Sequence, residues 1–134
     1  MKPNQSGMGA NADQPNPAEP KTILLVDDAP ETRSITKWFL TNFGYIVQSF
    51  PNAQDALALF DPRVHDLVVT DNMMPGMTGY EMAHIVKMRS PSTPVLMYTG
   101  RPPPDSSCVD LVIQKPAQLT VLKEAVDKLL ATRA

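Results

Sequence analysis

Acidic residues stand directly after two apolar runs of the sequence, where they could support chemistry. Asp27 and Asp28 follow the run TILLV, and Asp71 follows LVVT. Carboxylates gathered in one place repel one another, and their pKa values rise unless a cation neutralises them. Mg²⁺ suits hard oxygen ligands and is typically bound by one or two carboxylates together with a phosphate. These acids therefore indicate a magnesium site that works on a phosphoryl group.

A hydroxyl and a lysine extend this set. Thr99 follows the run VLMY, and Lys115 stands before Pro116. An aspartate carboxylate can attack a phosphoryl group and form an aspartyl-phosphate. Mg²⁺ and a lysine would neutralise the charge on the phosphoryl oxygens, which is most of what such a transfer requires, and Thr99 would donate its hydroxyl to one of them. We therefore interpret Asp71 as a phosphorylation site.

The segments that must position these residues alternate between short apolar runs and amphipathic stretches. This alternation is typical of βα units around a parallel sheet. Ligands of open α/β sheets bind outside the carboxyl ends of the strands. All the polar candidates should therefore share one edge of the sheet. The predicted strands are Thr22–Val26, Tyr45–Phe50, Leu67–Thr70, Val95–Tyr98 and Val109–Ile113.

Helices are predicted between and after these strands. Asn52 is a predicted N-cap, and the sequence TGYE from Thr78 is typical of a capping box. The segment Gly100–Cys108 departs from the pattern, because its nine residues include three consecutive prolines. Proline lacks the backbone donor that a helix needs. We therefore predict that the fourth helix is missing or reduced to a turn. The other predicted helices are Glu31–Asn42, Asn52–Phe60, one that opens at Thr78, and Gln118–Leu130.

Composition indicates one domain preceded by a tail. The chain has 134 residues, of which 43% are hydrophobic, and this is enough for one core. Residues 1–20 contain no Leu, Ile, Val or aromatic residue, so they cannot bury enough surface to order themselves. We expect a disordered N-terminal tail over residues 1–20 and a folded domain over residues 21–134.

Charge and cysteine content exclude several classes of function. The formal net charge of -2 provides no basic surface for nucleic acid or for an anionic membrane. Cys108 is the only cysteine, which excludes an intramolecular disulfide and a CxxC zinc site. The apolar runs are short and no signal peptide is recognisable, so we expect a cytoplasmic protein.

Each polar candidate also has an ordinary structural explanation. Asp28 could cap a helix, since Pro30 and Glu31 follow it, and Asp71 could be a turn acid. Thr99 could belong to a turn with Gly100, and Lys115 could enter a helix. The coincidence of all of them at strand ends favours the functional interpretation.

Two other phosphate chemistries fit this sequence less well. A flavodoxin-like cofactor binder would need a loop rich in Ser, Thr or Gly after the first strand, but DDAPET is acidic there and would repel a phosphate. A phosphatase of the haloacid-dehalogenase type would need an acid two residues after its nucleophile. Met73 occupies that position after Asp71.

Four motifs in order resemble the receiver domain of bacterial two-component response regulators. They are ILLVDD, LVVTDNMMPGMTGYEM, VLMYTG and VIQKP, and the resemblance covers residues 21–134. It implies a flavodoxin-like open parallel five-stranded sheet in the order 2-1-3-4-5, with helices on both faces. It also implies a cis peptide bond before Pro116, a bond type that is costly except before proline.

The resemblance also implies roles for individual residues. Asp71 would be the phosphoacceptor, Thr99 the switch hydroxyl and Lys115 the lysine that pairs with the phosphate. The implied Mg²⁺ ligands are Asp71, Asp28, Asp27 acting largely through water, and the backbone carbonyl of Met73.

Two features depart from the family pattern. Receivers usually place Tyr or Phe three residues before the lysine, where it reports phosphorylation, but this sequence has Val112. The shortened fourth connection removes a helix that normally contributes to output and dimerisation. Loss of this helix should leave apolar side chains uncovered, and uncovered apolar patches tend to mark interaction sites. We therefore expect a partner surface or a homodimer through this region.

These observations predict a stand-alone receiver that takes a phosphoryl group on Asp71 from a histidine kinase or a histidine phosphotransfer protein. Such a receiver would signal by contact with a downstream protein. We expect no enzyme activity beyond Mg²⁺-dependent self-phosphorylation and autodephosphorylation. The alternative is a receiver-like interaction module that works without phosphorylation.

Overall fold

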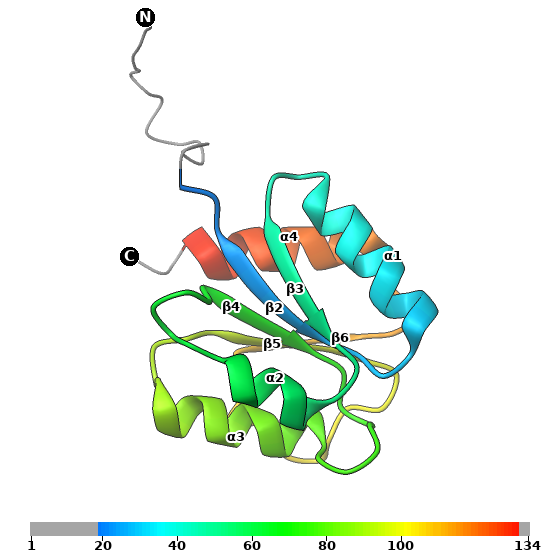
Figure 1. Cartoon of the computed structure of the whole chain (residues 1–134). Coiled ribbons are helices and arrows are strands. Elements are labelled where there is room, and N and C mark those ends of the chain that lie inside the picture. Colours follow the sequence, from blue (N-terminus) through cyan, green and yellow to red (C-terminus); the bar gives the residue numbers. More distant parts are fainter. Residues whose placement is uncertain (1–18, 132–134) are drawn as a thin grey trace, which may run out of the picture.

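The computed structural model describes residues 19–131 (Figure 1). The tail predicted for residues 1–20 lies outside the described residues except for Glu19 and Pro20, both of which are exposed. Residues 132–134 also lie outside them.

Five parallel strands form a single sheet in the order β3-β2-β4-β5-β6. In order along the chain this is 2-1-3-4-5, so the predicted topology is confirmed. The central strands β2, β4 and β5 are buried along their whole length, as expected for a sheet covered on both faces. The strands are β2 (Thr22–Val26), β3 (Ile46–Phe50), β4 (Leu67–Thr70), β5 (Val95–Thr99) and β6 (Leu111–Gln114).

Helices cover both faces of the sheet (Figure 1). They are α1 (Pro30–Thr41), α2 (Ala53–Leu59), α3 (Gly79–Arg89) and α4 (Leu119–Ala131). Alternate strand residues point to opposite faces, which creates two hydrophobic clusters: α1 and α4 pack on one face, and α2 and α3 on the other. Within residues 19–131, no helix combines the length and apolar character needed to cross a membrane.

The N-caps of the helices show which polar side chains are used to begin a helix and which are not. Asn52 caps α2 as predicted, because its side chain accepts the Asp55 N–H at 2.7 Å. The capping box at Thr78 is also confirmed. Helix α1, however, begins at Pro30 with Ala29 as its N-cap and without a side-chain cap. The capping role considered for Asp28 is therefore wrong.

The connection between β5 and β6, residues 100–110, contains neither helix nor strand and is called the strap below. The prediction that the helix between the fourth and fifth strands is missing is thus confirmed; the helix labelled α4 is the one that follows β6. One face of α3 holds the strap through three side chains spaced at helical intervals. The contacts are Tyr80 Oη to Asp105 Oδ2 at 3.2 Å, His84 Nδ1 to Cys108 Sγ at 3.2 Å, and Lys87 Nζ to Asp110 Oδ2 at 2.7 Å.

Asp110 also sets the start of the last strand. Its carboxylate accepts the Val95 N–H at 2.7 Å, and its own N–H donates to the Val95 carbonyl at 2.9 Å. The Val95 N–H therefore bonds to the Asp110 side chain instead of to a backbone carbonyl, and β6 begins at Leu111. The prediction placed this strand at Val109–Ile113, two residues too early at its start.

The strap covers the sheet that the missing helix was expected to leave bare. Val95 and Met97 of β5 are fully buried, and Cys108 and Val109 pack against the cluster of α2 and α3. Val112 is half-buried. The expectation of uncovered apolar side chains is not met for β5, and a homodimer through this region stays a prediction.

A close backbone contact anchors the loop after β4 to the start of α3. The Gly79 N–H donates to the Asn72 carbonyl at 2.8 Å. A Cβ atom at position 79 would lie 1.9 Å from the carbonyl oxygen of Asp71, so only glycine fits without a backbone shift. The loop that carries Asp71 therefore depends on Gly79.

His65, between α2 and β4, is buried as a neutral side chain. Its Nδ1 accepts the Asp61 N–H at 3.0 Å, and its Nε2 lies 2.8 Å from Gln48 Oε1, which it can reach as a donor. Its ring stacks on Phe60. Burial lowers the pKa of His65 below the ordinary value of 6.5.

The lowered pKa of His65 predicts a loss of stability in mild acid. Below pH 6.5 the unfolded chain binds a proton at this site before the folded chain does, so the free energy of unfolding falls as the pH drops from 6.5 toward the folded pKa. Above pH 6.5 this contribution is constant. Urea unfolding at several pH values checks this for the wild type and for His65→Gln, which should show a flatter dependence. An equal dependence in the two proteins would contradict it.

Gly79→Ala should destabilise the protein, because the new methyl group meets the Asp71 carbonyl. We expect the free energy of unfolding to fall by about 2 kcal/mol, the usual scale for overpacking. Gly100→Ala is the matched control, since a Cβ there meets nothing within 4 Å. Urea denaturation of both variants measures the effect, and equal stabilities would refute the close contact.

Candidate functional site

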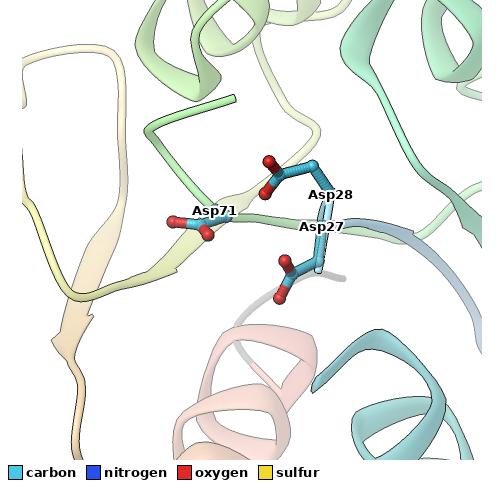
Figure 2. A group of neighbouring side chains, drawn as sticks. All are labelled: Asp27, Asp28 and Asp71. Carbon is cyan, nitrogen blue, oxygen red and sulfur yellow. The ribbon is translucent and has the colours of Figure 1, made fainter. Parts of the chain in front are cut away.

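Three carboxylates meet at the carboxyl edge of the sheet. Asp27 and Asp28 follow β2, and Asp71 follows the neighbouring strand β4 (Figure 2). One carboxylate oxygen from each lies within 4.8 Å of the others, a spacing that could hold a metal ion. The structure thus brings together the three acids that the sequence selected. We call them the acid cluster.

The members of the acid cluster differ in burial and in partners. Asp27 is 4% exposed, and its Oδ1 accepts the Ala29 N–H at 2.9 Å. Asp71 Oδ1 accepts the Asn72 N–H at 2.7 Å, which orients the carboxylate. Asp28 is exposed, and within residues 19–131 no hydrogen bond holds its carboxylate. Oxygens of Asp28 and Asp71 are therefore available to ligands.

Lys115 places its ammonium beside the acid cluster. Its Nζ lies 3.3 Å from Asp27 Oδ2 and 3.9 Å from Asp71 Oδ2. Burial raises the pKa of the Asp27 carboxyl above 3.8, and the Ala29 N–H and Lys115 oppose this rise without cancelling it. The cluster thus keeps an excess of negative charge beside this lysine. Its donor set, three carboxylates, fits a hard divalent cation such as Mg²⁺.

Thr99 ends β5 at the same edge and is 1% exposed. Its Oγ1 accepts the Arg101 N–H at 3.1 Å, so the hydroxyl hydrogen remains available to a ligand oxygen. Its carbonyl accepts the Lys115 N–H at 2.8 Å. This bond holds the two predicted catalytic residues, which are distant in sequence, next to each other at the ends of β5 and β6. The peptide bond from Lys115 to Pro116 is cis, as the family resemblance implied.

The side of the cluster near Asp28 opens to solvent. An open cleft of about 540 Å³ lies there, between the loops that follow β3 and β4. Met73 lies two residues beyond Asp71, and the residue is 51% exposed. Its predicted carbonyl contact with Mg²⁺ stays a prediction. The cleft is lined by Asp28, Pro51, Asn52, Gln54, Asp55, Pro75 and Gly76.

Asn72 is a site residue that the sequence did not reveal. Although it is polar, it is only 5% exposed. Its Nδ2 donates to the Arg101 carbonyl at 3.0 Å, and its Oδ1 accepts the Tyr80 N–H at 3.1 Å. It therefore ties the loop of Asp71 to both the strap and α3. An asparagine beside a turn carries no sequence signal for such a role.

Arg33 and Tyr98 also reach the site. Arg33 Nη1 donates to the Asp27 carbonyl at 2.7 Å. Because Arg33 lies in the first turn of α1, directly after the acids, its closeness to the site could have been predicted from the sequence. The ring of Tyr98 lies under Lys115, whose Nζ is 4.8 Å from the ring centroid. This contact joins β5 to the loop before α4, so it follows only from the fold.

Comparisons with known proteins agree with this geometry. Sensor protein EvgS of Escherichia coli is 32% identical over 127 residues, which cover 90% of this chain but 11% of that protein. The chain spans less than half the length of the curated relatives considered, 46% of one and 31% of another.

Solved structures match over most of both chains. Response regulator TrrA of Thermotoga maritima, solved with Mg²⁺ and BeF, has a TM-score of 0.76 and 32% identity, and the match covers 81% of this chain and 98% of TrrA. A CheY-like receiver domain protein of Methanospirillum hungatei has a TM-score of 0.81 and 27% identity, with 86% and 97% covered. The family model for the response regulator receiver domain matches residues 23–132. The chain belongs to the response regulator receiver domain family.

Proposed function

We propose that this protein is a phosphorylation switch in which Asp71 accepts a phosphoryl group from a histidine kinase or a histidine phosphotransfer protein. The observation that carries the proposal is the acid cluster with Lys115 beside it: three carboxylates within 4.8 Å, two of them within 4 Å of one ammonium. Like charges this close disfavour one another, so a divalent cation and a phosphoryl group that brings it would relieve the repulsion within the cluster.

Each residue of the site has a separate role in the phosphoryl transfer. An oxygen of Asp71 attacks the phosphorus of the donor phosphohistidine, the P–N bond breaks, and the histidine nitrogen keeps the electron pair and takes a proton. The Asn72 N–H fixes the orientation of the attacking carboxylate. Mg²⁺, held by Asp27, Asp28 and Asp71, would supply positive charge to the phosphoryl oxygens.

Lys115 and Thr99 act on the phosphoryl group once it is in place. Lys115 pairs with one phosphoryl oxygen, and Thr99 donates its hydroxyl to another. Attack by water on phosphorus returns the carboxylate and releases inorganic phosphate. The protein then catalyses only its own phosphorylation and dephosphorylation, and signals by contact with a downstream protein.

A phosphorylation-independent interaction module is the second candidate, and the strap favours it. Three side chains of α3 hold the strap, and the usual aromatic residue is replaced by Val112. Such a connection could be fixed in one state. The two candidates differ in whether Asp71 is modified at all.

Phosphorylation of Asp71 should be observed by intact-protein mass spectrometry. Incubation with Mg²⁺ and acetyl phosphate is expected to add one phosphoryl group to the wild type and none to Asp71→Asn, because only the carboxylate can form the acyl phosphate. A chelator should prevent the gain, since the charge of the acid cluster is then uncompensated.

Asp55→Asn is the matched control for this experiment. Asp55 lines the same cleft but lies outside the acid cluster, so this variant should be phosphorylated like the wild type. No gain of mass in the wild type would contradict the proposal and favour the interaction module. A gain in Asp71→Asn would place the modification elsewhere.

A further inference from the structure

An aromatic ring contacts the lysine of the site, although the position usual in the family holds valine. Tyr98 is 7% exposed, and the Lys115 Nζ lies 4.8 Å from its ring centroid, within the range of a cation–π contact. In the ladder between β5 and β6, Val112 pairs with Met97 and Tyr98 pairs with Ile113, so Val112 and Tyr98 point to opposite faces of the sheet.

We propose that Tyr98 reports the phosphorylation state of Asp71, by sensing the position of Lys115 and passing it to the start of α4. This inference rests on the proposed function and concerns how the same site is read. It assigns to Tyr98 a task that Val112 cannot perform.

The position of Lys115 depends on the charge at Asp71. Its ammonium is shared between Asp27, at 3.3 Å, Asp71, at 3.9 Å, and the face of the Tyr98 ring. Phosphorylation replaces the single charge of the Asp71 carboxylate with a phosphoryl group that carries more negative charge. The attraction toward position 71 therefore grows, and the ammonium shifts away from Asp27 and from the ring.

The far end of Tyr98 contacts the segment that leads into α4. Its hydroxyl donates to the Ala117 carbonyl at 3.4 Å, a long bond that a small shift would break. The ring also belongs to the hydrophobic cluster that contains Leu122 of α4, and Leu119 packs against the same cluster. A change at Lys115 therefore reaches the first turn of α4 through one side chain.

This route leads to the face of the sheet opposite the strap. Alternate residues of β5 point to opposite faces, and Tyr98 belongs to the cluster of α1 and α4. The strap lies over the other face, where α3 holds it. Phosphorylation should therefore alter α4, while the contacts of the strap with α3 persist.

Nuclear magnetic resonance of the protein with Mg²⁺ and beryllium fluoride tests this route. In the wild type, the Lys115 Hε resonances should lie upfield because of the ring and move downfield on addition of beryllium fluoride. Amide shifts are expected at Asp71 and Thr99, which report binding, and at residues 117–122, which report transmission.

Variants at Tyr98 separate the two steps. Tyr98→Phe keeps the ring and should retain the Lys115 shift while the shifts at residues 117–122 shrink, because the bond to Ala117 is gone. Tyr98→Leu should lose both. Tyr45→Phe is the matched control: Tyr45 also contacts α4, through Asp127, but lies away from Lys115, so wild-type shifts are expected.

The outcomes distinguish this inference from the proposed function. Shifts at Asp71 and Thr99 without shifts at residues 117–122 in the wild type would overturn the inference alone. Wild-type shifts at residues 117–122 in Tyr98→Phe or Tyr98→Leu would also overturn it. If beryllium fluoride moves no amide near Asp71, the proposed function fails, and this inference fails with it.

Discussion

Electrostatic repulsion among three carboxylates is the constraint on which the carboxyl edge of the sheet depends. Asp27, Asp28 and Asp71 come from adjacent strands, so the parallel topology itself forces them together. Lys115 approaches two of them, and burial still raises the pKa of Asp27. Because the site carries an excess of negative charge, binding of a divalent cation there is favourable. The bound cation would in turn attract a phosphoryl group.

The rest of the structure keeps these groups in place with few specialised contacts. Gly79 lets α3 approach the Asp71 carbonyl, and Asn72 joins the same loop to the strap. Ala29, a residue without a capping side chain, is the N-cap of α1, so the Asp28 carboxylate is not used as a cap and stays available. The strap connects β5 to β6 without a helix, and its contacts with α3 and, through Asp110, with Val95 hold it in place.

Local patterns in the sequence predicted the parallel sheet, the caps at Asn52 and Thr78, the missing helix and the residues of the acid cluster, whereas the strand order was implied by the family resemblance. These features follow from hydrophobic periodicity and from residue types at strand ends. The start of β6 was predicted too early because the Val95 N–H bonds to the Asp110 side chain instead of to a backbone carbonyl. The contacts of Tyr98 and Asn72 were missed because their partners are distant in sequence and become neighbours only in the folded sheet.

Isothermal titration calorimetry with Mg²⁺ tests the central claim, that the acid cluster is a cation site. We predict one Mg²⁺ bound per wild-type chain, binding weakened about tenfold or more in Asp28→Asn because an available ligand is lost, and unchanged binding in Asp55→Asn. Absence of binding to the wild type, or equal binding in Asp28→Asn and the wild type, would contradict it.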